Sequence, residues 1–173
     1  MLRLAFLACL ISVTVFAHQS RPVGNSANGL QDFSFVVGRW AGMFHMHPNA
    51  RMPKAAESQA RMIAKWGPQN AWIESEATTD LPGMGPYVAK VLVGFDPRGQ
   101  NFDSFVMNTV GGSARYSGKR EGNRVVFVGQ MGSVTQRVTY ENLSYKEMRF
   151  VVEDSRDAGK TFQPHSDIVW KRQ

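Results

Sequence analysis

Short runs of strand-forming residues recur every 10 to 14 positions, and they constrain the fold of this chain more than any other feature. Each run is rich in β-branched and aromatic residues, and turn-forming Gly, Pro, Asn or Asp residues separate it from the next. No convincing long helix follows Phe35, since apolar residues at helical spacing do not persist beyond it. The runs are approximately 36–47, 57–66, 71–79, 87–95, 101–109, 113–120, 124–130, 134–141, 146–153 and 161–171.

The connections between these runs are short, which limits the topology. A strand joined to the next by a tight turn pairs with it, so we expect an up-and-down antiparallel meander. Closing about ten such strands into a barrel removes the unpaired edges that invite aggregation. The all-β alternative is a two-sheet sandwich. Between Gly29 and Phe35 the apolar spacing predicts a short helical turn, which would plug one end of the barrel.

The run from Phe35 to His47 has the features of a first barrel strand. Alternate residues share a face, so Trp40 and Phe44 point one way while His45 and His47 point the other. Gly38 and Gly42 flank Trp40 on its own face, and missing side chains there let a sheet coil tightly around the ring. A Gly-x-Trp in the first strand with an arginine near the chain end resembles the calycin, or lipocalin-like, barrels. We therefore expect Arg172 to pack on Trp40 through a cation–π contact.

The N-terminal segment has the pattern of a secretory signal peptide. A basic residue precedes an apolar stretch that is too short to span a membrane, and small residues follow at the expected cleavage site. We expect cleavage after Ala17, a signal peptide over 1–17, a flexible leader over 18–29 and one domain over 30–173. This predicts a secreted or periplasmic protein with no membrane span. The single cysteine, Cys9, would be lost, which leaves no thiol for a disulfide or a nucleophile.

Hydrophobic content and net charge bear on the fold class and on the kind of partner that the protein binds. Hydrophobic residues make up 43% of the chain, which favours a globular domain over a disordered one. The net charge of +6 raises the question of an anionic partner, but the basic residues are scattered, with no run longer than two. We therefore expect no nucleic-acid partner. The run at 87–95 is nearly apolar on both faces, so we expect its outer face to be covered, for example by a second copy of the chain in a homodimer.

Several segments together resemble a family of uncharacterised calycin-like proteins, known as domain of unknown function 1579 (DUF1579). They are Phe35–Gly42, Ala71–Glu76, Val93–Asp96 and Asp167–Arg172, in matching order and spacing. The resemblance covers roughly residues 30 to 172 and departs at Phe105–Met107, where many members carry Trp-x-Asp. It implies a barrel, and export in some members, but no established activity.

A second similarity is to the nitrobindin-like heme barrels, whose last strand carries the pattern His-x-x-Ile-x-Tyr-x-Lys. Residues His165–Arg172 fall in that register, although the glycine run and Tyr-Pro of the nitrobindin opening are absent here. The similarity implies His165 as an axial heme ligand. Imidazole is a suitable ligand for heme iron, and nearby methionines would supply a soft apolar lining.

Other residue patterns leave alternatives open. His45 and His47 project from one face of a strand, which is half of a zinc or copper site that His165 or a carboxylate would complete. Two histidines near a strand end with no metal is the plainer interpretation. Glu74 and Glu76 also share one face of a strand. If they are buried, their pKa values are raised and they could act as an acid/base pair; if they are exposed, they are an ordinary solvated pair.

The function these observations favour is binding of a small, mostly apolar ligand inside an exported barrel. The alternatives are a heme barrel that uses His165 and an acid/base enzyme that uses Glu74 or Glu76. No phosphate-binding glycine loop, Gly-x-Ser-x-Gly or dinucleotide fingerprint is present, so catalysis has no positive signal. The candidate ligand contacts are Trp40, Phe44, Trp72, Glu74, Phe105 and His165.

Overall fold

A computed structural model describes residues 26–49, 53–81 and 85–173. The expected signal peptide over 1–17, its cleavage after Ala17 and the leader up to residue 25 lie outside the described residues. Among the described residues, no helix is long and apolar enough to cross a membrane.

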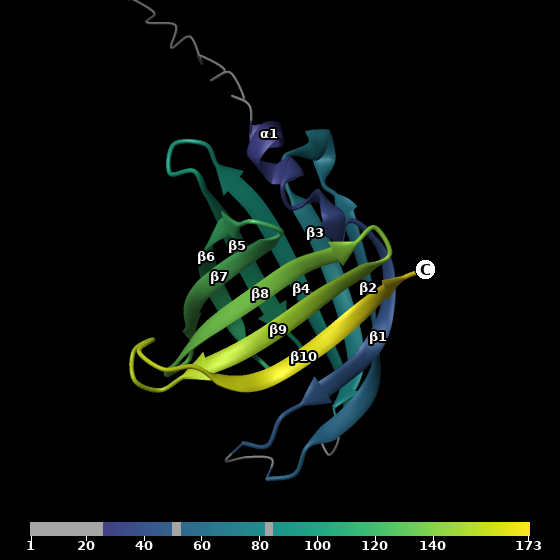
Figure 1. Cartoon of the computed structure of the whole chain (residues 1–173), viewed down its shortest axis with the longest axis vertical. Coiled ribbons are helices and arrows are strands. Elements are labelled where there is room, and N and C mark those ends of the chain that lie inside the picture. Colours follow the sequence, from purple (N-terminus) through teal and green to yellow (C-terminus); the bar gives the residue numbers. More distant parts are fainter. Residues whose placement is uncertain (1–25, 50–52, 82–84) are drawn as a thin grey trace, which may run out of the picture.

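The strands form a closed antiparallel barrel in which each strand pairs with its predecessor and the first pairs with the last. Figure 1 shows β8, β9 and β10 crossing the front of the barrel, with β1 beside β10. The meander and its closure are thus confirmed, and the sandwich is wrong. The strands are β1 (Gly38–Met46), β2 (Ala56–Trp66), β3 (Ile73–Leu81), β4 (Gly85–Asp96), β5 (Asn101–Asn108), β6 (Ser113–Glu121), β7 (Arg124–Met131), β8 (Val134–Ser144), β9 (Glu147–Ser155) and β10 (Gln163–Arg172).

Strand alternation sorts the side chains between the interior and the outer surface. In β6, Ala114 and Tyr116 are buried, whereas their neighbours Ser113 and Arg115 are exposed. In β1, Trp40 is buried and faces inward, as the sequence pattern predicts. His45 and His47 have the opposite parity and lie on the outer face.

Two short helices fill one end of the barrel (Figure 1). They are α1 (Ser26–Gln31) and the 3-10 helix η1 (Ser34–Val36). Phe33 lies between them, is 2% exposed, and meets the inward rings of Phe127 and Tyr140 edge-on, with centroids 5.7 and 5.1 Å away. The expected plug is confirmed, but it is split in two, because the chain bends at Phe33 to send that ring into the interior. The first helix also begins at Ser26, inside the segment expected to be a leader.

Trp40 and Arg172 hold the plugged end closed. The guanidinium of Arg172 lies 4.2 Å from the Trp40 ring centroid, which confirms the expected cation–π contact. Arg172 also donates to the carbonyls of Val37 at 2.7 Å and Phe35 at 3.1 Å. Gly38, at φ 147°, makes room for it, since a Cβ there would overlap the guanidinium.

Part of the outer surface is apolar and uncovered by any other described part of this chain. Leu92 on β4 is 42% exposed and faces Phe105 on β5, which is 41% exposed. The described part of the chain thus leaves the outer face of β4 uncovered, and the homodimer contact there stays a prediction.

Substituting Arg172 tests how much the closure contributes to stability. We expect Arg172→Ala to lower the free energy of unfolding by about 2–4 kcal/mol, because it removes a cation–π contact and several hydrogen bonds to backbone carbonyls. Urea denaturation measures this change. The matched control is Lys171→Ala on the exposed face of the same strand, expected to stay within about 0.5 kcal/mol of the original chain. Equal effects of the two changes would contradict the assigned role.

Candidate functional site

The inward side chains are more completely buried at one end of the barrel than at the other. Near α1 the inward side chains are large and buried, among them Phe102, Phe127 and Trp170, each at 2% exposure. Toward the far end many inward side chains keep partial exposure although they point into the barrel. We call this part the open half; its partly exposed inward residues are Phe44, Ser58, Ala77, Thr79, Tyr87, Val91, Val106, Asn108, Met131, Gln136, Val138, Val152 and Asp154.

The apolar lining of the open half rests on the filled half. Phe44, Val91, Val106 and Val138 pack against the buried cluster and are nevertheless partly exposed. Val91 illustrates the geometry, because its neighbours on the other face of β4, Lys90 and Leu92, are exposed outside the barrel. The open half is therefore the less completely buried part of the interior, and part of its lining is apolar.

A row of polar side chains crosses one wall of the open half. The hydroxyl of Tyr116 donates to Gln136 Oε1 at 2.7 Å, and Gln136 Nε2 donates to Asp154 Oδ1 at 2.9 Å. The second oxygen of Asp154 meets His165 Nδ1 at 2.9 Å. We call Tyr116, Gln136, Asp154 and His165 the polar row.

Strand register builds the polar row. Tyr116 lies opposite Gly129, Gly129 opposite Gln136, and Gln136 opposite Asp154, so the residues share one level across β6, β7, β8 and β9. Gly129 allows the tyrosine to reach across β7, because a Cβ there would lie 2.6 Å from Tyr116 Cδ1. A register shift in β10 between Pro164 and Ser166 then places His165 beside Asp154.

The local environment perturbs the ionisation of two groups in the row. Burial raises the pKa of Asp154, but the hydrogen bonds from His165 and Gln136 and the nearby cationic charge outweigh it, so its pKa lies below the ordinary value. Burial, with smaller contributions from Tyr87 and Asp154, raises the pKa of Tyr116 to about 12. At neutral pH the row therefore holds a carboxylate and a neutral phenol.

Three of the candidate ligand contacts lie along the interior. Trp40 is buried in the filled half, where it donates from Nε1 to the carbonyl of Val36 at 2.8 Å, so it closes the barrel rather than lining the open half. Phe44 lines the open half. His165 lies at its rim, with its side chain 31% exposed.

The other three lie outside the interior. Glu74 pairs with Lys65 at 2.9 Å on the outer face, and its neighbour Glu76 pairs with Lys90 at 3.2 Å. Neither carboxylate is buried, so the condition for an acid/base pair is not met. Phe105 is exposed on the outside of β5. Trp72 precedes β3, and its indole covers Gly67 in the β2–β3 connection.

The metal candidates are each engaged by a single carboxylate. His45 Nδ1 lies 3.0 Å from Glu57, and His47 Nε2 lies 2.7 Å from Asp167, both on the outer face. The imidazole of His165 pairs with Asp154, although its backbone carbonyl accepts from the N–H of His47 at 2.9 Å. Within residues 26–49, 53–81 and 85–173, no group of three or more His, Cys, Asp or Glu side chains is placed to hold a metal.

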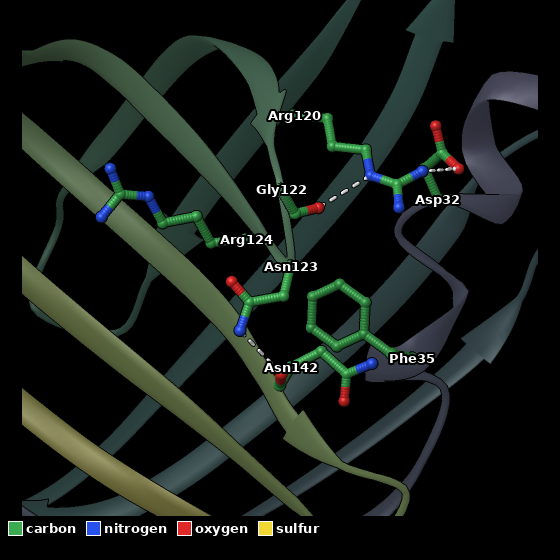
Figure 2. A pocket seen from close by; sticks show the side chains of 7 residues that line it. All are labelled: Asp32, Phe35, Arg120, Gly122, Asn123, Arg124 and Asn142. Atoms are coloured by element: carbon green, nitrogen blue, oxygen red, sulfur yellow. Dashed lines mark hydrogen bonds and ion pairs between the residues drawn. The ribbon is translucent and has the colours of Figure 1, made fainter.

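Two hollows on the outer surface lie along the seam between the plug and the barrel. The smaller, of about 50 Å³, is shown in Figure 2, where Arg120 extends to Asp32 on the plug and donates to the carbonyl of Gly122. The other is an open groove of about 560 Å³ whose floor includes Phe95 and Phe102 of the filled half. The charges along this seam attach the plug to β6 through an exposed ion pair.

Sequence reasoning did not select Gln136 or Asp154 and left Tyr116 without an assigned role. A signal for Asp154 was nevertheless present. In β9 the alternation that sends Met148, Phe150 and Val152 inward reaches Asp154 two residues later. A charged residue at the next position of a series of inward apolar residues is expected to point into the barrel as well.

Comparison with known proteins identifies a family and a fold. A family model described as "Protein of unknown function (DUF1579)" matches residues 31–165. The crystal structure of Rv2717c from M. tuberculosis is similar, with a TM-score of 0.65 and 16% identity over 84% of this chain and 97% of that one. An S-type phycobiliprotein lyase, CPES from Guillardia theta, has a TM-score of 0.58 and 10% identity over 83% of this chain and 91% of that one. Curated proteins give no match.

The polar row makes a pH-dependent contribution to stability that Asp154→Asn tests. Because the pKa of Asp154 is lowered, its contribution is present above the ordinary value of 3.8 and is lost as pH falls through the lowered value. We expect the variant to be less stable by about 1–3 kcal/mol at pH 7, with the difference shrinking in acid. Urea denaturation at pH 7 and at pH 3 measures it.

The control for this change is Asp103→Asn on the outer face, where the carboxylate pairs with Arg115 at 3.2 Å in an exposed contact. It should change stability by no more than about 0.5 kcal/mol at either pH. A constant difference between Asp154→Asn and the original chain across the pH range would contradict the assigned hydrogen bonds.

Proposed function

The chain belongs to the DUF1579 family, and we propose that its barrel binds a small, mostly apolar ligand in the open half of its interior. The observation that carries this proposal is that inward side chains such as Val91 and Val106 remain partly exposed in mid-barrel. Interiors filled by their own side chains bury such residues. An apolar surface that is solvated and concave gains free energy when an apolar molecule displaces the water.

The lining fits a ligand with two different ends. Its floor is made of valine and phenylalanine side chains resting on the buried cluster, whereas the polar row lies along the wall near the rim. Ligand sites commonly combine an apolar body with a few placed polar groups that fix orientation. The ligand would place its apolar part on the floor and its polar part at the rim.

Similar folds give only general support. The likeness to the phycobiliprotein lyase and to Rv2717c shows a shared barrel at 10% and 16% identity. At that level the ligand of one barrel does not transfer to another, because the lining residues differ. The proposal therefore rests on the interior of this chain.

We also propose that the protein is exported, on the evidence of the N-terminal pattern over 1–17. A ligand-binding barrel outside the cytoplasm would meet molecules taken up or released by the cell. The intact mass of the protein purified from a bacterial periplasm tests export, because cleavage after Ala17 gives the mass of a chain that starts at His18.

Filling the interior tests the binding proposal. We expect the protein to bind the neutral apolar fluorophore N-phenyl-1-naphthylamine, and Val106→Trp to weaken binding by about tenfold or more, because the larger ring occupies the open half. Fluorescence titration gives both affinities. The matched control is Val128→Trp, at a position that is 44% exposed on the outer face and should leave the affinity unchanged. Undiminished binding by Val106→Trp would show that the fluorophore binds elsewhere.

Heme is a second candidate, favoured by the geometry of His165. Its Nδ1 is held by Asp154, and Nε2 has no partner among the described residues. A metal-bound histidine commonly donates its other ring N–H to a carboxylate in this way, which fixes the ring and makes it a stronger ligand. His165 fits the role of axial ligand, with heme supplying the redox or gas-binding chemistry.

Hemin binding tests this candidate. We expect added hemin to give a Soret shift, and His165→Ala to weaken binding by about tenfold or more, because the axial ligand is lost. His45→Ala, which removes a histidine from the outer face, serves as the control. Hemin affinity unchanged by His165→Ala would remove heme from consideration while leaving the apolar-ligand proposal in place.

A further inference from the structure

The direction of the hydrogen bonds in the polar row determines which chemical groups it leaves available. The phenol of Tyr116 donates to Gln136, and the amide of Gln136 donates to Asp154. Asp154 is ionised at neutral pH, so it accepts from His165 Nδ1, which must carry the proton. Two donors, from Gln136 and His165, therefore converge on one carboxylate.

This arrangement uses most of the donors and leaves acceptors free. The phenol proton and one amide proton of Gln136 are engaged within the row. When the imidazole of His165 is neutral, its Nε2 carries a lone pair, and no described residue forms a hydrogen bond with it. The phenol oxygen and the carboxylate oxygens also retain lone pairs. The row therefore offers acceptors, together with one negative charge, at the rim.

Asp154 is the one carboxylate among the described inward residues of the open half, and the arginines and lysines of these strands point outward. Arg137 beside it is on the outer face, in a paired contact of 2.7 Å with Glu153. The basic groups close enough to lower its pKa are the imidazole of His165 and the exposed Arg156, which follows β9. Within the described lining, a ligand thus meets the Asp154 carboxylate with no arginine or lysine beside it.

We infer that the polar end of the ligand is a hydrogen-bond donor, a hydroxyl or an ammonium, and not a carboxylate. The inference rests on the proposed function, since it names the chemistry of the group that reaches the rim. A hydroxyl donates to His165 Nε2 or to Asp154, and an ammonium gains attraction to the carboxylate. A ligand carboxylate brings further acceptors and a like charge, which the row repels.

Three probes with the same ten-carbon tail test this inference: 1-decanol, decylamine and decanoate. Calorimetric titration at pH 8, with decanoate ionised and decylamine protonated, compares the polar ends directly. We expect decanol and decylamine to bind at least about tenfold more tightly than decanoate. Decanoate binding as tightly as decanol would overturn the inference and leave the proposed function intact.

Removing the charge provides a second measurement. In Asp154→Asn we expect decanoate affinity to rise toward that of decanol, so that the selectivity falls to about threefold or less. Glu153→Gln removes the same charge from the neighbouring residue, on the outer face, and should leave the selectivity unchanged. Equal loss of selectivity in both variants would show that the Asp154 carboxylate is not the source of the selectivity and would overturn the inference. If Asp154→Asn fails to fold, the comparison of the three probes on the unaltered chain still tests it.

The outcomes also separate the two proposals. If none of the three probes binds while N-phenyl-1-naphthylamine does, the inference that the ligand ends in a hydrogen-bond donor is wrong, and the proposal of an apolar ligand site still holds. If the fluorophore does not bind either, the proposed function fails and the inference fails with it.

Discussion

The contact between Arg172 and Trp40 is the constraint on which the rest of the structure depends, because it joins the last strand, the first strand and the plug. The guanidinium stacks on the indole at 4.2 Å and donates to the backbone carbonyl of Phe35, within the second short helix, and to that of Val37, just after it. One residue pair thus ties the plug to the β1–β10 ladder that closes the barrel. A planar guanidinium suits this role, since it can stack and donate in several directions at once.

Closure at one end determines where space remains in the barrel. The plug inserts Phe33 among large inward rings such as Phe102 and Phe127, and this half is buried. Farther along the same strands, several inward positions carry small residues, such as Ala114 and Gly129, or β-branched ones such as Val106. Many inward side chains there are less completely buried than those around Phe33, and the proposed ligand site depends on this difference.

Alternation and turn chemistry were sufficient to predict the strands, their order and closure, because short connections leave little freedom in pairing. They also predicted the inward face of β1, where Trp40 identifies the interior. The same reasoning selected Glu74 and Phe105, which lie outside, because alternation divides a strand into two faces without saying which is inner. The polar row was harder to predict, since it depends on register across β6 to β10 and on a register shift at His165. The spacing within one strand does not encode which residue of the next strand lies opposite, nor where a register shift occurs.

The net charge of the chain is likewise a poor predictor of the partner that the protein binds. A charge of +6 points toward anionic partners, yet the basic residues of β6 and β8, such as Arg115 and Arg137, lie on the outer face in pairs with acids. In the open half the inward charged group is the carboxylate of Asp154. Because that charge is partly buried, solvent screens it less than it screens the surface cations. The proposed ligand would therefore meet a carboxylate inside a protein whose net charge is positive, so the geometry of the interior is the better guide to its chemistry.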